Sequence, residues 1–417
     1  MRHVFIMGAK SVGQYGGFET FADELVRRLG PKDEFKFHVA CKANGDGCMD
    51  ESKLPEARNF ERRGDGTVRR FEYFGADVFK LQVPNIGPAV AIWYDVAAMR
   101  ACLDYCEKNG IRNPIFYLLA CRIGPFLAPL KKRLRRLGGV LFVNPDGHEW
   151  RRSKWSKPVR KYWKISEGLT VRNADLLICD SKGIETYVRN EYAELSPRTV
   201  YVAYGADTSK STVSDSDPRF VEWLDRVGTK PNEYYLVVGR LVPENNFETM
   251  VGEFMKSRSK RKLVLVTNEN ERLRNDLEEK LNFSDDSRIV FAGPEYDGDM
   301  LKKIRENAYA YLHGHSVGGT NPSLLEALAS TKLNLLYSVN FNSEVAGDAA
   351  LYWTKEDGSL SSLVDEVDDM DEATRDEFER SAKARIERAF TWDKIASRYE
   401  RLFLGKRKGK ERNAEAR

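Results

Sequence analysis

A glycine-rich segment that leads into a helical pattern is the clearest candidate for phosphate chemistry. Gly318, Gly319 and Thr320 precede Asn321, which is suited to cap the helix that follows. Free backbone N–H groups at a helix start, together with the positive end of the helix dipole, attract phosphate oxygens. Glu326, one turn into the helix, could accept hydrogen bonds from two ribose hydroxyls. The alternative for Glu326 is an acidic residue that only favours the helix dipole.

A second group of residues directly follows predicted strands. Arg240 comes after the apolar run 234–238, and Asp146 and His148 come after the run 140–144. Open α/β sheets bind ligands at the carboxyl ends of their strands. The Arg240 guanidinium could hold a phosphate there and stabilise a leaving diphosphate, or it could form a salt bridge. Asp146 could contact an acceptor or could close a turn.

The first loop of the chain is a weaker candidate. Gly16 and Gly17 precede an amphipathic helical pattern, so their backbone could approach a phosphate or a sugar hydroxyl, although a purely structural turn explains them as well. The loop matches neither the Gly-x-Gly-x-x-Gly nor the P-loop pattern. The six cysteines form no Cys-x-x-Cys pair, and the histidines and acidic pairs show no convincing ligand spacing. We expect no metal and no cofactor.

Charge is unevenly distributed along a chain whose net charge is only +4. Residues 131–164 hold twelve Lys or Arg against two acidic residues, whereas residues 356–379 hold eleven acidic residues against one Arg. A basic block this dense suggests an anionic partner. The residues in and around this block that we expect to face an acceptor or a membrane are Lys131, Lys132, Arg133, Arg135, Arg136, Asp146, His148, Trp150, Arg151, Arg152, Lys154 and Trp155.

The block has two parts with different patterns. Residues 125–137 place leucines on one helical face and cations on the other, which is typical of a helix on an anionic membrane. Residues 150–164 interleave aromatic residues with cations, which suits a lipid headgroup interface or, less well, a nucleic acid. A solvated helix face over an ordinary core is the alternative for both parts. We expect a membrane surface and no nucleic acid.

The elements that must position these residues are alternating strands and helices. Short apolar runs lie at 3–8, 37–40, 114–119, 140–144, 176–179 and 199–203, and again at 234–238, 262–266, 288–292, 308–312 and 333–337. This alternation indicates two α/β domains with parallel sheets, at 1–205 and 233–388. The segment 206–232 is a polar connection, 389–405 is a last helix, and 406–417 is a basic tail. No apolar run is long enough to span a membrane and no cleavable signal is visible, so we expect a cytoplasmic protein.

Six blocks resemble, in order, those of retaining glycosyltransferases of the family 4 type. They are Tyr15–Thr20, Asp146–Trp150, Asp180–Glu185, Tyr204–Asp207, Gly239–Asn246 and His313–Glu326. More narrowly, they are similar to the blocks of β-1,4-rhamnosyltransferases of streptococcal-type capsule and rhamnan synthesis. The resemblance covers nearly the whole chain.

The resemblance implies the GT-B fold, with two Rossmann-like doubly wound parallel-sheet domains that face each other across a cleft. Residues 1–205 would bind the acceptor, residues 233–388 would bind the nucleotide sugar, and the last helix would return to the first domain. The reaction implied moves L-rhamnose from dTDP-rhamnose to the first sugar, GlcNAc or Glc, of an undecaprenyl-diphosphate carrier. The enzyme would work at the inner face of the cell membrane.

On this hypothesis the transfer is retaining and metal-independent. Arg240, Glu326 and Asp146 would be catalytic, and donor binding would further involve Gly16, Gly17, Glu19, Gly318, Gly319, Thr320 and Asn321. The broad family has a glutamate where this chain has Gly318 and a lysine where it has Asn245. Three alternatives stay open: a UDP- or GDP-sugar donor, a nucleotide-sugar epimerase or hydrolase of the same fold, and a catalytically silent membrane-bound scaffold.

Overall fold

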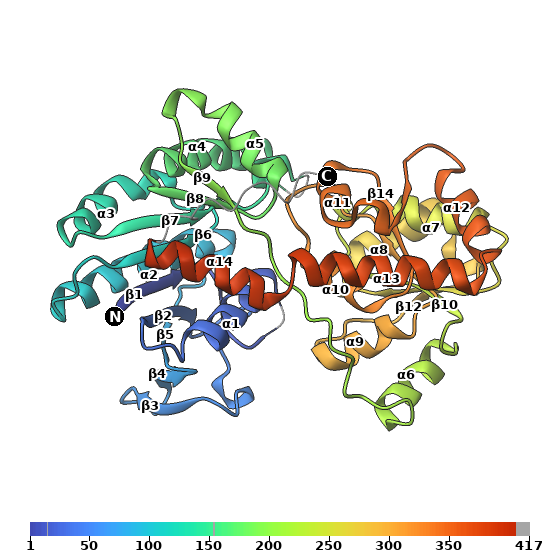
Figure 1. Cartoon of the computed structure of the whole chain (residues 1–417), viewed down its shortest axis with the longest axis horizontal. Helices are drawn as coiled ribbons and strands as arrows, with labels where there is room; N and C mark the ends of the chain where they lie inside the picture. The colour runs from blue at the N-terminus through green and yellow to red at the C-terminus, as the bar shows by residue number, and fades with distance from the viewer. Residues whose placement is uncertain (15, 153–154, 406–417) are drawn as a thin grey trace.

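The protein is described by a computed structural model that covers residues 1–14, 16–152 and 155–405. Figure 1 shows two α/β lobes side by side, with the N-terminal half of the chain in one and most of the C-terminal half in the other. The tail predicted at 406–417 lies outside the described residues.

The first sheet has nine strands in the order β3-β4-β5-β2-β1-β6-β7-β8-β9. Their bounds are β1 (Arg2–Met7), β2 (Phe35–Lys42), β3 (Arg58–Arg62), β4 (Val68–Tyr73), β5 (Ala76–Leu81), β6 (Ile115–Leu119), β7 (Val140–Asn144), β8 (Leu176–Cys179) and β9 (Thr199–Tyr201). The six apolar runs of this half all form strands, and these pair in parallel. The predicted parallel sheet has in addition an edge that was not predicted, where β3 and β4 and then β4 and β5 pair antiparallel.

The second sheet has six strands in the order β12-β11-β10-β13-β14-β15, all parallel. Their bounds are β10 (Tyr234–Val238), β11 (Lys262–Val266), β12 (Ile289–Phe291), β13 (Ala310–His313), β14 (Asn334–Tyr337) and β15 (Leu351–Trp353). Only β15 lacks a counterpart among the predicted strands of this half. Burial of β10, β11, β13 and β14 on both faces explains why these strands appear in the sequence as unbroken apolar runs.

Helices cover both sheets. Those of the first half are α1 (Gly17–Leu29), α2 (Val90–Lys108), α3 (Gly124–Arg136), α4 (Lys157–Asn173) and α5 (Lys182–Glu191). The later ones are α6 (Pro218–Val227), α7 (Phe247–Lys256), α8 (Glu271–Leu281), α9 (Gly298–Glu306), α10 (Pro322–Ser330), α11 (Asn340–Ala346), α12 (Ser359–Asp368), α13 (Glu372–Ala389) and α14 (Trp392–Leu404). Helices α2, α3 and α4 pack side by side over the first sheet, whereas α14 packs on α1 and β1.

Helix α14 joins the C-terminal end of the chain to the first sheet. Figure 1 shows α13 and α14 running from the second lobe across to the first. Tyr399 and Phe403 of α14 are buried, and the Tyr399 hydroxyl lies 2.9 Å from that of Tyr117 on β6. At the helix surface, Asp393 accepts a hydrogen bond from Arg28 of α1 at 2.6 Å. The packing of α14 thus fixes one lobe to the other through apolar burial.

The predicted connection at 206–232 is wrong in its second half. Residues 218–227 form α6, and Phe220, Trp223 and Val227 pack with Tyr234 in the core of the second domain. The helix was missed because the polar stretch that precedes it was extended up to the next apolar strand. Only the part before α6 connects the two sheets.

The membrane-surface helix predicted at 125–137 is also wrong in its apolar face. Leu127, Leu130 and Leu134 of α3 are buried in the core between α2, α4 and the first sheet. Lys131, predicted to face the membrane, is buried as well and forms an ion pair with Asp175. The solvated face over an ordinary core, the alternative stated above, is what the structure has. Among the helices of the described residues, none has the length and the apolar character needed to cross a membrane.

Candidate active site

A large cleft of about 2120 Å³ separates the two domains. Its lining includes most of the predicted site, and the strands deliver these residues from their carboxyl ends, as parallel sheets do. The predicted residues along it are Gly16, Gly17, Glu19, Asp146, Trp150, Arg152, Trp155, Arg240, Gly318, Gly319, Thr320, Asn321 and Glu326.

The predicted helix start after Gly318–Thr320 is present in the second domain. The Asn321 side chain accepts a hydrogen bond from the Ser323 N–H at 2.9 Å and caps α10. Pro322 is the first residue of the helix, where its missing N–H costs nothing. The residues from Gly318 to Asn321 therefore present the positive end of α10 to the cleft.

Gly318 has a backbone conformation that favours glycine. Its φ is +138°, a value that residues with a side chain rarely adopt, and an added Cβ would lie 3.2 Å from Nε2 of His315. Gly318 also packs closely against Gly147 of the first domain: a Cβ added to Gly147 would lie 2.4 Å from the Cα of Gly318. The loop is therefore shaped for close backbone packing across the cleft.

Asn245 fixes its surroundings through two side-chain contacts. Its amide nitrogen donates to the Arg240 carbonyl at 2.7 Å, and its amide oxygen lies 2.8 Å from Nδ1 of His315. Burial, followed by the charges of Arg152 and Arg240, lowers the pKa of His315 to about 4. A neutral His315 with its proton on Nδ1 satisfies this arrangement, since the Asn245 oxygen can only accept.

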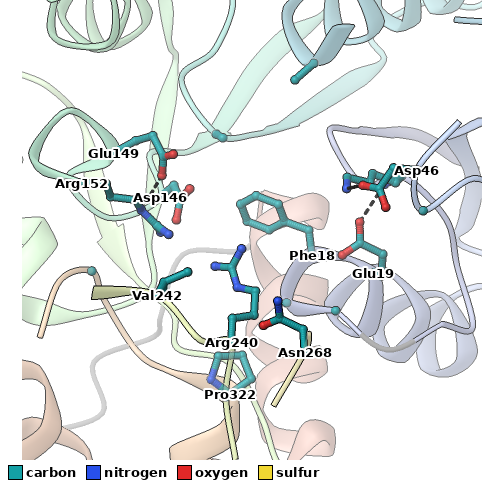
Figure 2. A pocket seen from close by; sticks show the side chains of 18 of the residues that line it. Phe18, Glu19, Asp46, Asp146, Glu149, Arg152, Arg240, Val242, Asn268 and Pro322 are labelled. Atoms are coloured by element: carbon teal, nitrogen blue, oxygen red, sulfur yellow. Dashed lines mark hydrogen bonds and ion pairs between the residues drawn. The ribbon is translucent and has the colours of Figure 1, made fainter. Parts of the chain in front are cut away.

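Arg240 extends from the end of β10 into the cleft. Figure 2 shows its guanidinium between Phe18 of the first domain and Asn268 of the second. Within the described residues, Arg240 takes part in none of the ion pairs, so its charge is available to a ligand. The salt-bridge alternative for Arg240 is therefore not what the structure shows.

Glu326 lines the cleft from α10 and is held by a cation. The NH2 group of Arg305 lies 2.7 Å from Oε2 of Glu326, and the Arg305 side chain is buried. The pair fixes one carboxylate oxygen, and Glu326 as a whole remains part of the cleft wall.

The first-domain wall carries Asp146 and Glu19. Asp146 adopts a left-handed backbone with φ +58°, and its N–H donates to the Asn144 side chain at 2.8 Å. The turn is thus closed by Asn144, which leaves the Asp146 carboxylate facing the cleft (Figure 2). Glu19 accepts a hydrogen bond from the Lys10 backbone at 2.9 Å, so it ties the first loop to the start of α1.

Arg152 belongs to the cleft and not to an outer basic surface. Its side chain is 15% exposed and its Nε lies 2.6 Å from Glu149. Figure 2 shows the guanidinium of Arg152 directed toward Arg240 from the opposite domain. A diphosphate between the domains would therefore meet two guanidiniums, one from each side.

Asp180 is a site residue that the sequence reasoning did not select. It directly follows β8, is buried, and its Oδ1 has no hydrogen-bond partner among the described residues. A Cβ on Gly319 would lie 1.9 Å from this oxygen, and the Thr320 hydroxyl donates to the Asp180 carbonyl. Burial, with the charges of Asp146 and Glu344, raises the pKa of Asp180 to about 8. A neutral acid therefore abuts the Gly318–Asn321 loop at neutral pH.

Several predicted residues lie away from the cleft. The His148 ring packs on Tyr187 with centroids 4.2 Å apart, and its pKa falls to about 4 because of burial and the Arg151 charge. Arg151 is exposed outside the cleft lining. The exposed cations Lys132, Arg135 and Arg136 stand on α3, where Arg133 pairs with Asp104 and Glu107. Lys154 lies outside the described residues.

The described residues contain no group of three or more His, Cys, Asp or Glu placed to hold a metal ion. What the cleft offers is oriented positive charge from Arg240, Arg152 and the start of α10, with carboxylates at Glu326 and Asp146. Such a site can bind a nucleoside diphosphate and stabilise it as a leaving group.

One family model matches the N-terminal part of the chain. Residues 1–207 match the model of a domain of unknown function, DUF1972. None of the curated protein sequences compared with this chain matches it.

Solved structures match nearly the whole chain. Sucrose-phosphate synthase from Thermosynechococcus elongatus has a TM-score of 0.71 at 15% identity, covering 97% of this chain and 99% of that one. Anabaena HepE in complex with UDP and glucose has a TM-score of 0.68 at 13% identity, covering 97% and 100%. An α,α-trehalose-phosphate synthase (UDP-forming) from Burkholderia vietnamiensis has a TM-score of 0.67 at 11% identity, also covering 97% and 100%. By its architecture, the chain is a GT-B protein with two Rossmann-like domains around a cleft.

Proposed function

We propose that this chain is a glycosyltransferase that takes its sugar from a nucleoside diphosphate sugar. One observation carries the proposal: Arg240 and the helix start at Gly318–Asn321 line the same cleft. Among the described residues, Arg240 has no carboxylate partner. A leaving diphosphate needs this kind of preorganised positive charge. Glu326, held by Arg305, would bind the ribose hydroxyls.

The finer proposal names dTDP-rhamnose as donor and the first sugar of an undecaprenyl-diphosphate carrier as acceptor, at the inner membrane face. It is supported by the six sequence blocks from Tyr15–Thr20 to His313–Glu326. In a retaining transfer the acceptor hydroxyl attacks the anomeric carbon on the side that the diphosphate leaves. The bond from that carbon to the diphosphate breaks, and a phosphate oxygen takes the proton of the hydroxyl. Asp146 would position the acceptor and Glu19 the donor.

A UDP-sugar is the second candidate donor. The fold neighbours favour it, since HepE is described in complex with UDP and glucose and the trehalose-phosphate synthase as UDP-forming.

Thermal shift with dTDP-rhamnose, UDP-glucose and GDP-mannose separates the candidates. A donor at a hundredfold excess over its Kd should stabilise the protein by about 2.7 kcal/mol. We expect dTDP-rhamnose to raise the Tm most and EDTA to leave the shift unchanged. A shift with UDP-glucose alone would select the second candidate, and no shift with any donor would contradict the proposal.

A further inference from the structure

A second hollow, of about 610 Å³, lies beside the cleft and has no role in the site described above. It is lined by Trp150, Arg151, Arg160, Lys161 and Lys164. Trp150 also lines the cleft, so the two cavities share a wall. A ligand in the hollow would therefore reach the edge of the cleft between the domains.

The hollow carries positive charge that the protein does not neutralise. Lys164 is paired with Glu191 at 2.7 Å and with Glu167 at 3.2 Å. Within the described residues, Arg151, Arg160 and Lys161 take part in no ion pair. Three of the four cations therefore remain available to an anion.

Two of the walls are fixed in place before any ligand arrives. The Arg160 guanidinium donates to the carbonyls of Arg152 at 3.2 Å and Arg151 at 3.0 Å, which orient it without offsetting its charge. The Trp150 ring is flanked by the Arg151 guanidinium at 4.9 Å and the Lys164 ammonium at 4.8 Å. Preorganised cations around one point bind a compact polyanion better than they bind a flat charged surface.

We propose that this hollow binds the phosphate or diphosphate group of the acceptor, so that the sugar attached to it reaches the cleft past Trp150. The inference rests on the proposed function for the identity of the acceptor. A planar membrane contact is the less suitable occupant, because the leucines of α3 that would have entered a bilayer are buried in the core.

Calorimetric titration of the full chain tests the site with farnesyl diphosphate, inorganic pyrophosphate and farnesol as probes. The double variant Arg160→Gln/Lys161→Gln removes two of the unpaired charges. The matched control, Lys108→Gln/Arg172→Gln, removes two exposed cations from the last turns of α2 and α4. Loss of charge-assisted hydrogen bonds should weaken farnesyl diphosphate binding about tenfold for each cation in the first variant and not in the control.

Equal binding of pyrophosphate and farnesyl diphosphate would support the site and assign it to a free phosphate ligand. Undiminished binding by Arg160→Gln/Lys161→Gln, or farnesol binding as tight as that of farnesyl diphosphate, would overturn the proposal. Binding to phosphatidylglycerol vesicles is measured as well. If Arg160→Gln/Lys161→Gln weakens vesicle binding but not farnesyl diphosphate binding, the proposal is overturned in favour of a membrane contact. Titration of dTDP-rhamnose into the same variants should give wild-type affinity. If wild type itself does not bind dTDP-rhamnose, the proposed donor fails while the farnesyl diphosphate result still decides the hollow.

Discussion

At the scale of single residues, the cleft concentrates positive charge from both domains. Arg240 stands without a carboxylate partner in the described chain, whereas Arg152 is partly offset by Glu149. Arg240 should therefore contribute more to stabilising a leaving diphosphate than Arg152 does. His315, whose pKa is lowered to about 4 by burial and by the charges of both arginines, adds no charge of its own.

Arg240→Ala should lower kcat by about a hundredfold to a thousandfold, as loss of one preorganised donor to a developing charge does in other enzymes. Arg226→Ala, which removes an exposed cation of the second domain outside the cleft, should leave kcat within twofold of wild type, about the scale of small surface effects. Initial rates of sugar transfer measure both variants. Equal rates for Arg240→Ala and wild type would remove Arg240 from the mechanism.

Asp180 makes a prediction about pH. Its pKa is raised to about 8 by burial, so the folded protein holds a proton that the unfolded chain releases near its ordinary value. The free energy of unfolding therefore falls as the pH rises from about 4 to about 8, because the unfolded chain loses this proton more readily than the folded protein does. Asp180→Asn keeps the shape and cannot ionise.

The Tm of Asp180→Asn should match that of wild type below about pH 4, exceed it increasingly as the pH rises to about 8, and change little relative to it above that. Melting curves of the two proteins across this range measure the difference. A difference that does not change with pH would show that Asp180 is ionised, or equally protonated, in both states.

At the scale of elements, the β13–α10 loop and the end of β8 are built to touch. Gly319→Ala would place a methyl group 1.9 Å from Asp180 Oδ1. We expect a loss of about 1–3 kcal/mol in the free energy of unfolding, typical of overpacking. Gly298→Ala, at the start of α9 with open space around it, is the matched control and should change little.

The companion double variant Gly319→Ala/Asp180→Ala tests the cause. If the clash is with the carboxyl, the cost of the Gly319 methyl should largely disappear once that carboxyl is removed. Denaturant unfolding of the four proteins completes the cycle. If the two substitutions change the free energy of unfolding additively, the strain caused by the Gly319 methyl group lies elsewhere.

Elements that form continuous apolar runs were predictable from the sequence, and the ends of these strands located Arg240, Asp146 and the Gly318–Asn321 loop. The antiparallel strands β3 and β4 were missed because their sequences are not apolar runs. In β4, for example, buried Val68 and Phe71 are separated by two arginines. Helix α3 was misassigned because an apolar stripe facing a core has the same period as one facing a bilayer. Asp180 stands in one of the six sequence blocks but was not selected as a site residue, since an aspartate before the helix-capping Ser181 resembles an ordinary turn residue.

At the scale of the whole molecule, the two lobes are held together by α14 on one side and by helix α11 on the other. Glu344 of α11 accepts hydrogen bonds from the Lys182 and Gly183 N–H groups at the start of α5. The basic residues that are consecutive in the sequence lie in three separate places in the structure: the cleft, the neighbouring hollow and the outer face of α3.

Phe403→Ala tests the role of α14. The ring is buried against Phe35, Phe37 and Tyr117 of the first sheet, so its removal should cost about 3–5 kcal/mol. Arg401→Ala on the same helix removes an exposed side chain and should cost far less. Thermal unfolding of both variants measures the contrast. Equal Tm values would mean that α14 contributes little to joining the lobes.

The most direct test of the central claim is the stoichiometry of the reaction itself. The chain is incubated with dTDP-rhamnose and a GlcNAc-diphospholipid, and released dTDP and rhamnosylated lipid are both quantified by mass spectrometry. The account predicts one rhamnosylated lipid for each dTDP released, with both lost in Arg240→Ala. Release of dTDP without glycosylated lipid would indicate a hydrolase, and turnover of neither dTDP-rhamnose nor a UDP-sugar would contradict the assignment as a glycosyltransferase.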